Sequence, residues 1–130
     1  MREPYTQLYV HLMWATWDRL PLLTPERQKA AFACIHAECT QMRAEVLAVG
    51  GVEDHVHLLV RVPATITVAS LVRQVKGASS HLLTHQIPGA DGFKWQGAYG
   101  AFTVSHRDVP IVKDYVRGQA QHHGDGSILS

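Results

Sequence analysis

The sequence contains little cysteine: Cys34 and Cys39 are the two thiols in its 130 residues. They fall five positions apart in one helical pattern, so their side chains point in different directions and a disulfide between them is not expected. A Cys-x-x-Cys motif is absent, which excludes the commonest thiolate metal sites.

Net charge is also lacking, because 12 Lys and Arg residues nearly balance 11 Asp and Glu residues to give +1. A protein that holds nucleic acid mainly through bulk electrostatic attraction usually carries a larger positive excess. The composition therefore argues against that mode of binding, and it leaves room for a local basic site.

Long apolar runs and low-complexity segments are missing as well. No stretch has the length of a transmembrane span or the pattern of a signal peptide, so we expect a soluble cytoplasmic protein. A length of 130 residues and a hydrophobic fraction of 46% suit one domain with a substantial core. We predict a single domain over residues 1–130.

Histidine, in contrast, is abundant, with nine residues. His55 and His57 lie in a segment, residues 52–63, that is typical of a strand ending at Pro63. Side chains alternate along a strand, so the two imidazoles share one face, as a metal ion requires. The opposite face carries Val56, Leu58, Val60 and Val62. From this strand alone, a solvated polar face is an equally good interpretation.

Further strands are predicted over residues 5–17, 46–49 and 98–105. Gly50-Gly51 is expected to form the hairpin turn into the His-x-His strand. His11 lies on the less apolar face of the first strand, and we expect a structural or DNA-facing role for it rather than a ligand role.

Helices are predicted after Thr24, Thr67 and Asp108, each at an N-cap position, and the last should run to about His123. The middle helix should bury the stripe Val68, Leu71, Val72, Val75, Ala78 and Leu82.

The predicted fold class is α+β: a ferredoxin-like four-stranded antiparallel sheet with two helices on one face and a C-terminal helix carrying a tyrosine. The two histidines would lie on the other face. Because the final helix has no place in the two-helix layer, it can pack over that other face or onto a partner subunit.

The final helix places Tyr115 and Gln119 one turn apart on the same side. A lone helical tyrosine is usually just a half-buried aromatic. Combined with the histidines, the pattern indicates more: His55, His57 and Gln119 would form an open three-ligand site for Mg²⁺ or Mn²⁺. Such a metal polarises a phosphodiester, and Tyr115 would then be the nucleophile. Zinc is the alternative metal.

These motifs resemble the HUH-type single-tyrosine transposases, which include the small bacterial insertion-sequence transposases and the REP-associated tyrosine transposases. The resemblance rests on His55-Val56-His57 and on the Tyr-x-x-x-Gln helix. It extends over nearly the whole chain, through Tyr9-Val10-His11 and residues 75–79 and 95–105.

The resemblance implies a DNA strand transferase that binds single-stranded DNA hairpins and cleaves and rejoins DNA through a 5′-phosphotyrosine intermediate. It makes Tyr115 the nucleophile, makes His55, His57 and Gln119 the ligands of a divalent Mg²⁺ or Mn²⁺, and favours a homodimer, with a monomer also possible. The cations best placed to contact phosphate are Arg61, Arg73, Lys76, Lys94, Arg107 and Arg117.

Two other functions stay open. A domesticated, non-catalytic module would use the same fold to bind hairpin DNA or RNA, although it would have no reason to keep all four site residues. A metal hydrolase would use water as the attacking group, with Tyr115 only structural, and would form no covalent protein–DNA adduct.

Overall fold

The computed structural model describes residues 5–87, 89 and 92–119. Its elements are β1 (Tyr9–Ala15), η1 (Trp17–Arg19), α1 (Pro25–Gln41), β2 (Glu45–Val52), β3 (His55–Arg61), α2 (Val68–Gln86), β4 (Gly100–Val104), η2 (His106–Asp108) and α3 (Val109–Arg117). The strands pair antiparallel in the order β2-β3-β1-β4, which confirms the predicted fold class. Within the described residues, no helix is both long and apolar enough to span a bilayer.

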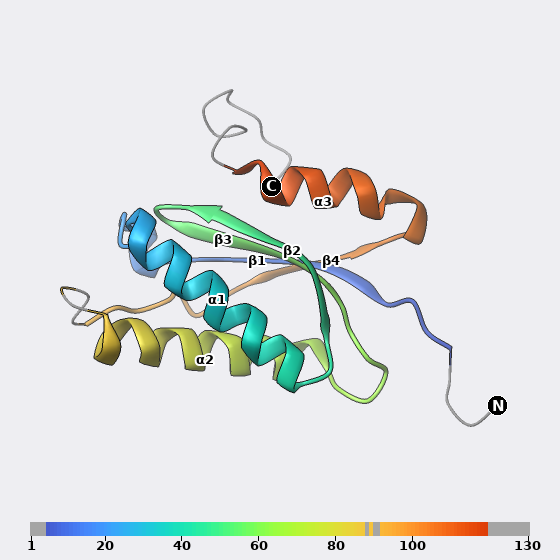
Figure 1. Ribbon diagram of the computed structural model, residues 1–130, viewed down its shortest axis with the longest axis horizontal. Helices are drawn as coiled ribbons and strands as arrows, with labels where there is room; N and C mark the ends of the chain where they lie inside the picture. The colour runs from blue at the N-terminus through green and yellow to red at the C-terminus, as the bar shows by residue number, and fades with distance from the viewer. Residues whose placement is uncertain (1–4, 88, 90–91, 120–130) are drawn as a thin grey trace.

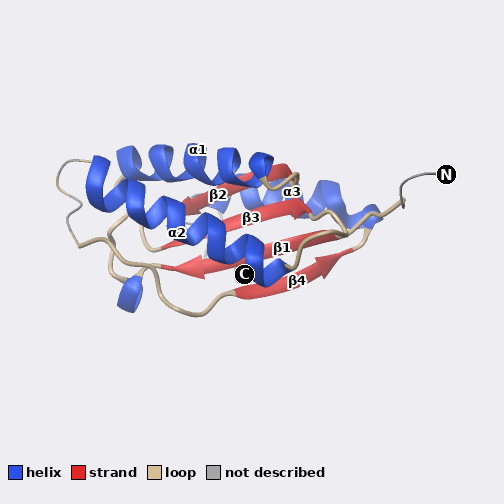
Figure 2. Ribbon diagram, turned by 90° about the horizontal axis from the view of Figure 1, so that it is seen from below, coloured by secondary structure: helices blue, strands red, loops and turns tan. Residues whose placement is uncertain are grey.

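Helices lie on both sides of the sheet. α1 and α2 cover one face and α3 covers the other (Figures 1 and 2). The main core lies between the sheet and α1 and α2, where Leu12, Ile35 and Leu58 are fully buried. α3 packs on β2 and β3 of its own chain. The sequence left open where this helix would dock, and the structure places it over the histidine face.

The first residues of the three long helices can be compared with the predicted N-caps. Thr24 accepts a hydrogen bond from the Arg27 amide at 3.3 Å and Thr67 accepts one from the Ser70 amide at 3.0 Å, which confirms both caps. Asp108 stands before α3, but its side chain makes no capping hydrogen bond. α3 ends at Arg117, with Gly118 as C-cap, and the predicted continuation to about residue 123 extends outside the described residues.

The hairpin turn differs from the prediction. β2 runs through Gly50 and Gly51 to Val52, and the turn is formed by Glu53 and Asp54. A Cβ atom on Gly50 would collide with the backbone carbonyl oxygen of Val116 in α3. The glycine therefore serves the close approach of α3 to the sheet rather than a turn. The first strand is also shorter than predicted, because β1 covers residues 9–15 of the expected 5–17.

The buried stripe of α2 is rotated in its second half. Ser79 and Leu83 are buried there, where the sequence pattern predicted Ala78 and Leu82. The Trp95 indole N–H donates to the Ser79 hydroxyl at 3.0 Å, and that hydroxyl donates to the Val75 carbonyl at 2.6 Å. The segment that follows α2 is a loop, as predicted. It places the buried Trp95 against α2, and the helix side that is buried there carries Ser79 and Leu83.

Candidate active site

The histidine pair lies on the face of β3 that α3 covers. His55 and His57 are 7% and 0% exposed, and their ring centroids are 5.0 Å apart. The valines of the same strand pack into the main core on the opposite face. The alternation predicted from the sequence is confirmed, but the histidines are buried rather than solvated. Burying a polar group is costly unless it is hydrogen-bonded, so their partners matter.

Tyr115, in the last turn of α3, and Gln119, two residues past the end of that helix, face this pair. Both side chains are buried, and the Tyr115 ring stands edge-on to the His57 ring with centroids 5.7 Å apart. Val116, the next residue, packs with Leu59 of β3 in a small apolar cluster. α3 and the residues directly after it thus bring a tyrosine and an amide to the two imidazoles within one chain.

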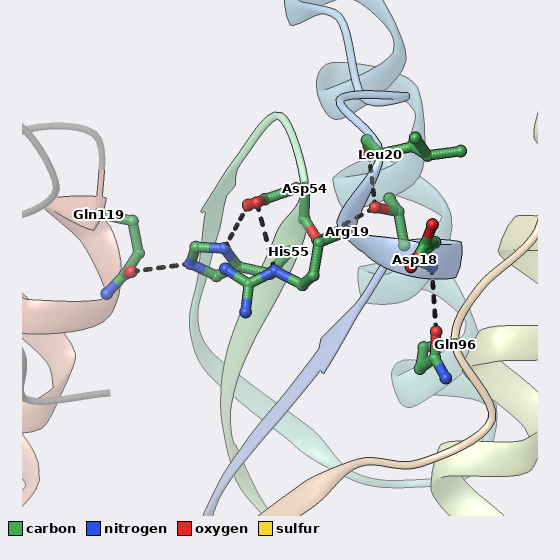
Figure 3. Close-up of polar contacts among 8 residues, drawn as sticks. Asp18, Arg19, Leu20, Asp54, His55, Gln96 and Gln119 are labelled. Carbon is green, nitrogen blue, oxygen red and sulfur yellow. Dashed lines mark hydrogen bonds and ion pairs between the residues drawn. The ribbon is translucent and has the colours of Figure 1, made fainter.

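A hydrogen bond to the backbone sets the orientation of Gln119. Its side-chain nitrogen donates to the Tyr115 carbonyl oxygen at 3.1 Å. The amide oxygen is consequently turned toward His55, 3.5 Å from Nε2 (Figure 3).

Asp54, in the hairpin turn, holds the other side of His55. Its carboxylate lies 2.7 Å from His55 Nδ1 and 3.2 Å from Arg19 Nε (Figure 3). Partial burial raises the pKa of Asp54, but the hydrogen bonds and charges of His55 and Arg19 outweigh that effect and keep the pKa below its usual value. The carboxylate therefore stays ionised at neutral pH.

The backbone under Arg19 is unusual. Asp18 and Arg19 both have a φ of 54°, a left-handed conformation that residues other than glycine rarely adopt. The Asp18 amide donates to the side-chain oxygen of Gln96 at 3.0 Å, and the guanidinium of Arg19 binds Asp54. Such strain persists where surrounding contacts hold it, and it is common next to functional sites.

The donor atoms of this site suit a divalent cation. A carboxylate only accepts hydrogen bonds, so the proton of a neutral His55 lies on Nδ1, toward Asp54. The Nε2 lone pair then converges with the Gln119 oxygen, a second acceptor, and a cation between them satisfies both. Imidazole nitrogen suits transition metals and amide oxygen suits Mg²⁺ or Mn²⁺. Among the described residues, no three His, Cys, Asp or Glu side chains form a metal cluster, so a three-ligand site built on His55 and His57 would need Gln119.

His11 is the residue whose place the sequence did not reveal. Its Nε2 lies 2.8 Å from His57 Nδ1, and its ring centroid is 6.2 Å from that of Tyr115. Burial lowers the pKa of His11, which keeps the ring neutral at neutral pH. That His11 is not a metal ligand remains a prediction. No signal in the sequence could have paired His11 with His57, because the pairing depends on strand register.

Three of the predicted phosphate-binding cations share one groove. Arg73, Lys76 and Lys94 line a hollow of about 560 Å³ between α2 and the loop before β4. The Lys76 ammonium donates to the carbonyl oxygens of Gln96 and Gly97, so it also ties the loop to α2. Lys94 lies over the Trp17 ring, with Nζ 4.0 Å from the centroid.

The other three predicted cations lie elsewhere. Arg61 forms an ion pair with Glu45 at 3.0 Å and lines a different hollow. Arg107 is exposed in η2 beside Asp108, and Arg117 is exposed at the end of α3. The structure does not bring these three arginines into the groove of Arg73.

A second hollow, of about 320 Å³, lies directly against the histidine pair. His55, His57 and Arg19 all line this hollow, and Arg19 adds a positive charge to it. Gln96 and Tyr99 line both this hollow and the groove of Arg73, so the two are neighbours. The surface beside the imidazoles therefore leads to a basic groove.

The sequence matches the model of the family described as IS200-like transposases over residues 4–119. It is 26% identical over 126 residues to the transposases for insertion sequence element IS200 of Salmonella typhimurium and Salmonella typhi, covering 92% of this chain and 82% of theirs.

Two solved structures are similar in fold. A crystal structure of a proposed transposase from Deinococcus radiodurans R1 superposes with a TM-score of 0.69 at 26% identity, over 89% of this chain and 93% of the other. A REP-associated tyrosine transposase bound to a REP hairpin superposes with a TM-score of 0.68 at 17% identity, over 98% of this chain and 74% of the other.

Proposed function

Since this chain belongs to the family of IS200-like transposases, we propose that it binds single-stranded DNA hairpins and cleaves and rejoins DNA through a 5′-phosphotyrosine link. One observation carries the proposal. A single face holds a tyrosine, two imidazoles and an amide oxygen, with Tyr115 against His57 and Gln119 against His55. A hydrolase that used water would not need a tyrosine at this position.

In the proposed reaction, the Tyr115 hydroxyl gives up its proton to solvent as its oxygen attacks the phosphorus of a phosphodiester, and solvent returns a proton to the oxygen that leaves. The new tyrosine–phosphorus bond replaces the bond from phosphorus to the 3′ oxygen, which leaves and takes up a proton as a free 3′-OH. Rejoining reverses the exchange: a 3′-OH attacks, the tyrosine oxygen leaves, and the side chain regains its proton. Each step exchanges one ester for another, so the strand can be resealed without an external energy source.

A divalent Mg²⁺ or Mn²⁺ is the proposed cofactor, held by His55, His57 and Gln119. When bound, it would polarise the phosphate and offset the charge that develops during the attack. The chain contributes orientation, because Asp54 holds His55 by Nδ1 and the Tyr115 carbonyl holds the Gln119 amide. Partners of this outer kind typically keep metal ligands in position.

The proposed path of the DNA strand begins in the hollow beside the histidines. It crosses Tyr99, which is 40% exposed, and enters the groove of Arg73 and Lys94. Cations that follow the backbone, together with an exposed aromatic ring on which a base can stack, are the usual means of holding single-stranded DNA. Arg61, Arg107 and Arg117 remain proposed contacts to phosphates outside this groove.

We expect a homodimer, with a monomer as the alternative, and we propose that Tyr115 acts on the histidines of its own chain. The packing of α3 on its own β2 and β3 supports this assignment. An equimolar mixture of Tyr115→Phe and His57→Ala variants should then form no covalent adduct with DNA. Adducts in the mixture would show that the tyrosine helix is exchanged between subunits.

The decisive experiment incubates the protein with labelled single-stranded hairpin DNA, taken from the flanks of its gene, and Mn²⁺. A denaturing gel should show a slow covalent adduct that a chelator removes. Tyr115→Phe should abolish the adduct while hairpin binding persists, and the matched variant Tyr9→Phe should retain it.

Two results would contradict the proposal. Hairpin binding without any adduct would indicate the domesticated binding module. Metal-dependent cleavage without a covalent intermediate, unaffected by Tyr115→Phe, would indicate a hydrolase.

A further inference from the structure

His11 and His57 form a buried pair across two neighbouring strands. His11 Nε2 lies 2.8 Å from His57 Nδ1, and the ring centroids are 5.0 Å apart. The rings are 8% and 0% exposed. In the register of β1 and β3, Met13 stands opposite His57, so His11 is the diagonal neighbour two residues along on the same face. The contact is therefore built into the strand pairing.

A hydrogen bond between two ring nitrogens has a direction. One nitrogen carries the proton and the other offers a lone pair. If His57 donates from Nδ1, its Nε2 has the lone pair that a metal ligand needs. If His11 donates instead, a neutral His57 carries its proton on Nε2 and cannot bind a metal through that atom.

We propose that His11 is a positioning residue that accepts the proton of His57 Nδ1 and so holds His57 in the tautomer able to bind a metal through Nε2. This inference rests on the proposed function, in which His57 is a ligand. His11 would contact neither the metal nor the DNA, and it would act only through His57.

His55, the other proposed histidine ligand, has a similar hydrogen-bonding partner at its Nδ1, but that partner is a carboxylate. His55 Nδ1 faces the carboxylate of Asp54 at 2.7 Å. Asp54 lies in the hairpin turn, where its side chain is 22% exposed, whereas His11 is buried beside Tyr115. An ionised carboxylate is costly to bury, and a neutral imidazole accepts the same hydrogen bond at lower cost. The two partners thus match the burial of the ligands they hold.

The first test uses the wild-type protein without metal or DNA. Two-dimensional NMR of ¹⁵N-labelled histidine rings distinguishes the tautomers by the shifts of Nδ1 and Nε2. We expect His57 to carry its proton on Nδ1 and His11 to carry its proton on the nitrogen away from His57. A His57 with its proton on Nε2 would overturn the proposal without any variant being made.

The second test compares two substitutions of His11. His11→Gln retains a neutral acceptor, and His11→Phe fills a similar volume without one. We expect His11→Phe to shift His57 toward the Nε2–H tautomer and to weaken Mn²⁺ binding by about 10- to 100-fold, the usual cost of losing an outer partner. His11→Gln should keep the tautomer and bind within a few-fold of wild type.

Calorimetric titration with Mn²⁺ and urea unfolding of both variants complete the design. Equal Mn²⁺ affinity in His11→Phe and wild type would show that His11 only fills volume, and it would overturn the proposal. A wild-type protein that binds no Mn²⁺ at all would instead refute the proposed metal site, and the tautomer of His57 would still be measured separately. The two failures are therefore distinguishable.

Discussion

The two faces of the sheet are built on different principles. The face under α1 and α2 is closed by apolar side chains, and Leu58 is fully buried there. The face under α3 has only a small apolar cluster around Leu59, next to buried histidines. On that side the polar groups have hydrogen-bonding partners supplied by β1, the hairpin turn and α3. The face under α1 and α2 thus buries the larger apolar cluster, and the other face accommodates buried polar groups that have hydrogen-bonding partners.

Leu58 and Leu59 offer the sharpest contrast, since they are adjacent, fully buried and on opposite faces. We expect Leu58→Ala to lower the free energy of unfolding by about 2–5 kcal/mol, as large-to-small changes in a close-packed core do. Leu59→Ala should cost less stability, because its cluster is small, but should reduce adduct formation more by loosening α3. Urea unfolding and the DNA adduct assay measure the two effects. Equal losses in both assays would contradict the division between the faces.

Gly50 tests how closely α3 must approach the sheet. Gly50→Ala introduces a Cβ against the Val116 carbonyl, and such overpacking costs about 1–3 kcal/mol. The matched control is Gly77→Ala in α2, where no atom lies within 4 Å of the added Cβ; it should stabilise the helix by up to about 1 kcal/mol. Hydrogen exchange of the α3 amides, followed beside urea unfolding, should speed up only in Gly50→Ala. Unchanged α3 exchange in that variant would contradict the close-approach role.

Asp54 tests whether the polar partners of the histidines matter for the proposed metal site. Asp54→Ala removes the group that holds His55 Nδ1, and we expect Mn²⁺ affinity to fall by about 10- to 100-fold. Glu45→Ala is the control: it also deprives an arginine of its ion-pair partner, but it lies opposite Arg61 at the far end of β3. Calorimetry should show wild-type affinity for Glu45→Ala. A similar loss in both variants would point to a general effect of charge.

The smallest effect concerns pH. Burial lowers the pKa of His11 in the folded state below its ordinary value of 6.5. As pH falls below that value, the unfolded chain binds a proton that the folded chain does not, so stability should fall, by at most about 1.4 kcal/mol per pH unit for one group. Around His11 stand His57 of β3, Tyr115 of α3 and Phe102 of β4. Urea unfolding between pH 5 and 7.5 should show that the free energy of unfolding depends less steeply on pH in His11→Phe than in wild type. Identical pH dependences would contradict a lowered pKa of His11.

Local patterns in the sequence were enough to predict much of this molecule. Alternation along a strand placed His55 and His57 on the face away from the valines, and helical spacing placed Tyr115 and Gln119 on one side. Thr24 and Thr67 marked helix starts because a cap depends only on the next three residues. These features have periods of a few residues, so one chain segment contains all the information they need.

Only the tertiary structure decided the rest. Register between β1 and β3 paired His11 with His57, and docking of α3 explained Gly50, which resembles a turn residue when the sequence is read alone. The buried stripe of α2 is rotated where Trp95, in the loop that follows the helix, donates a hydrogen bond to Ser79. In each case the partner lies in another segment of the chain, beyond the reach of a local pattern, and packing between segments brings the two together. The amino-acid sequence determined which faces of the strand and helix carry the candidate site residues, and the fold determined which of their atoms meet.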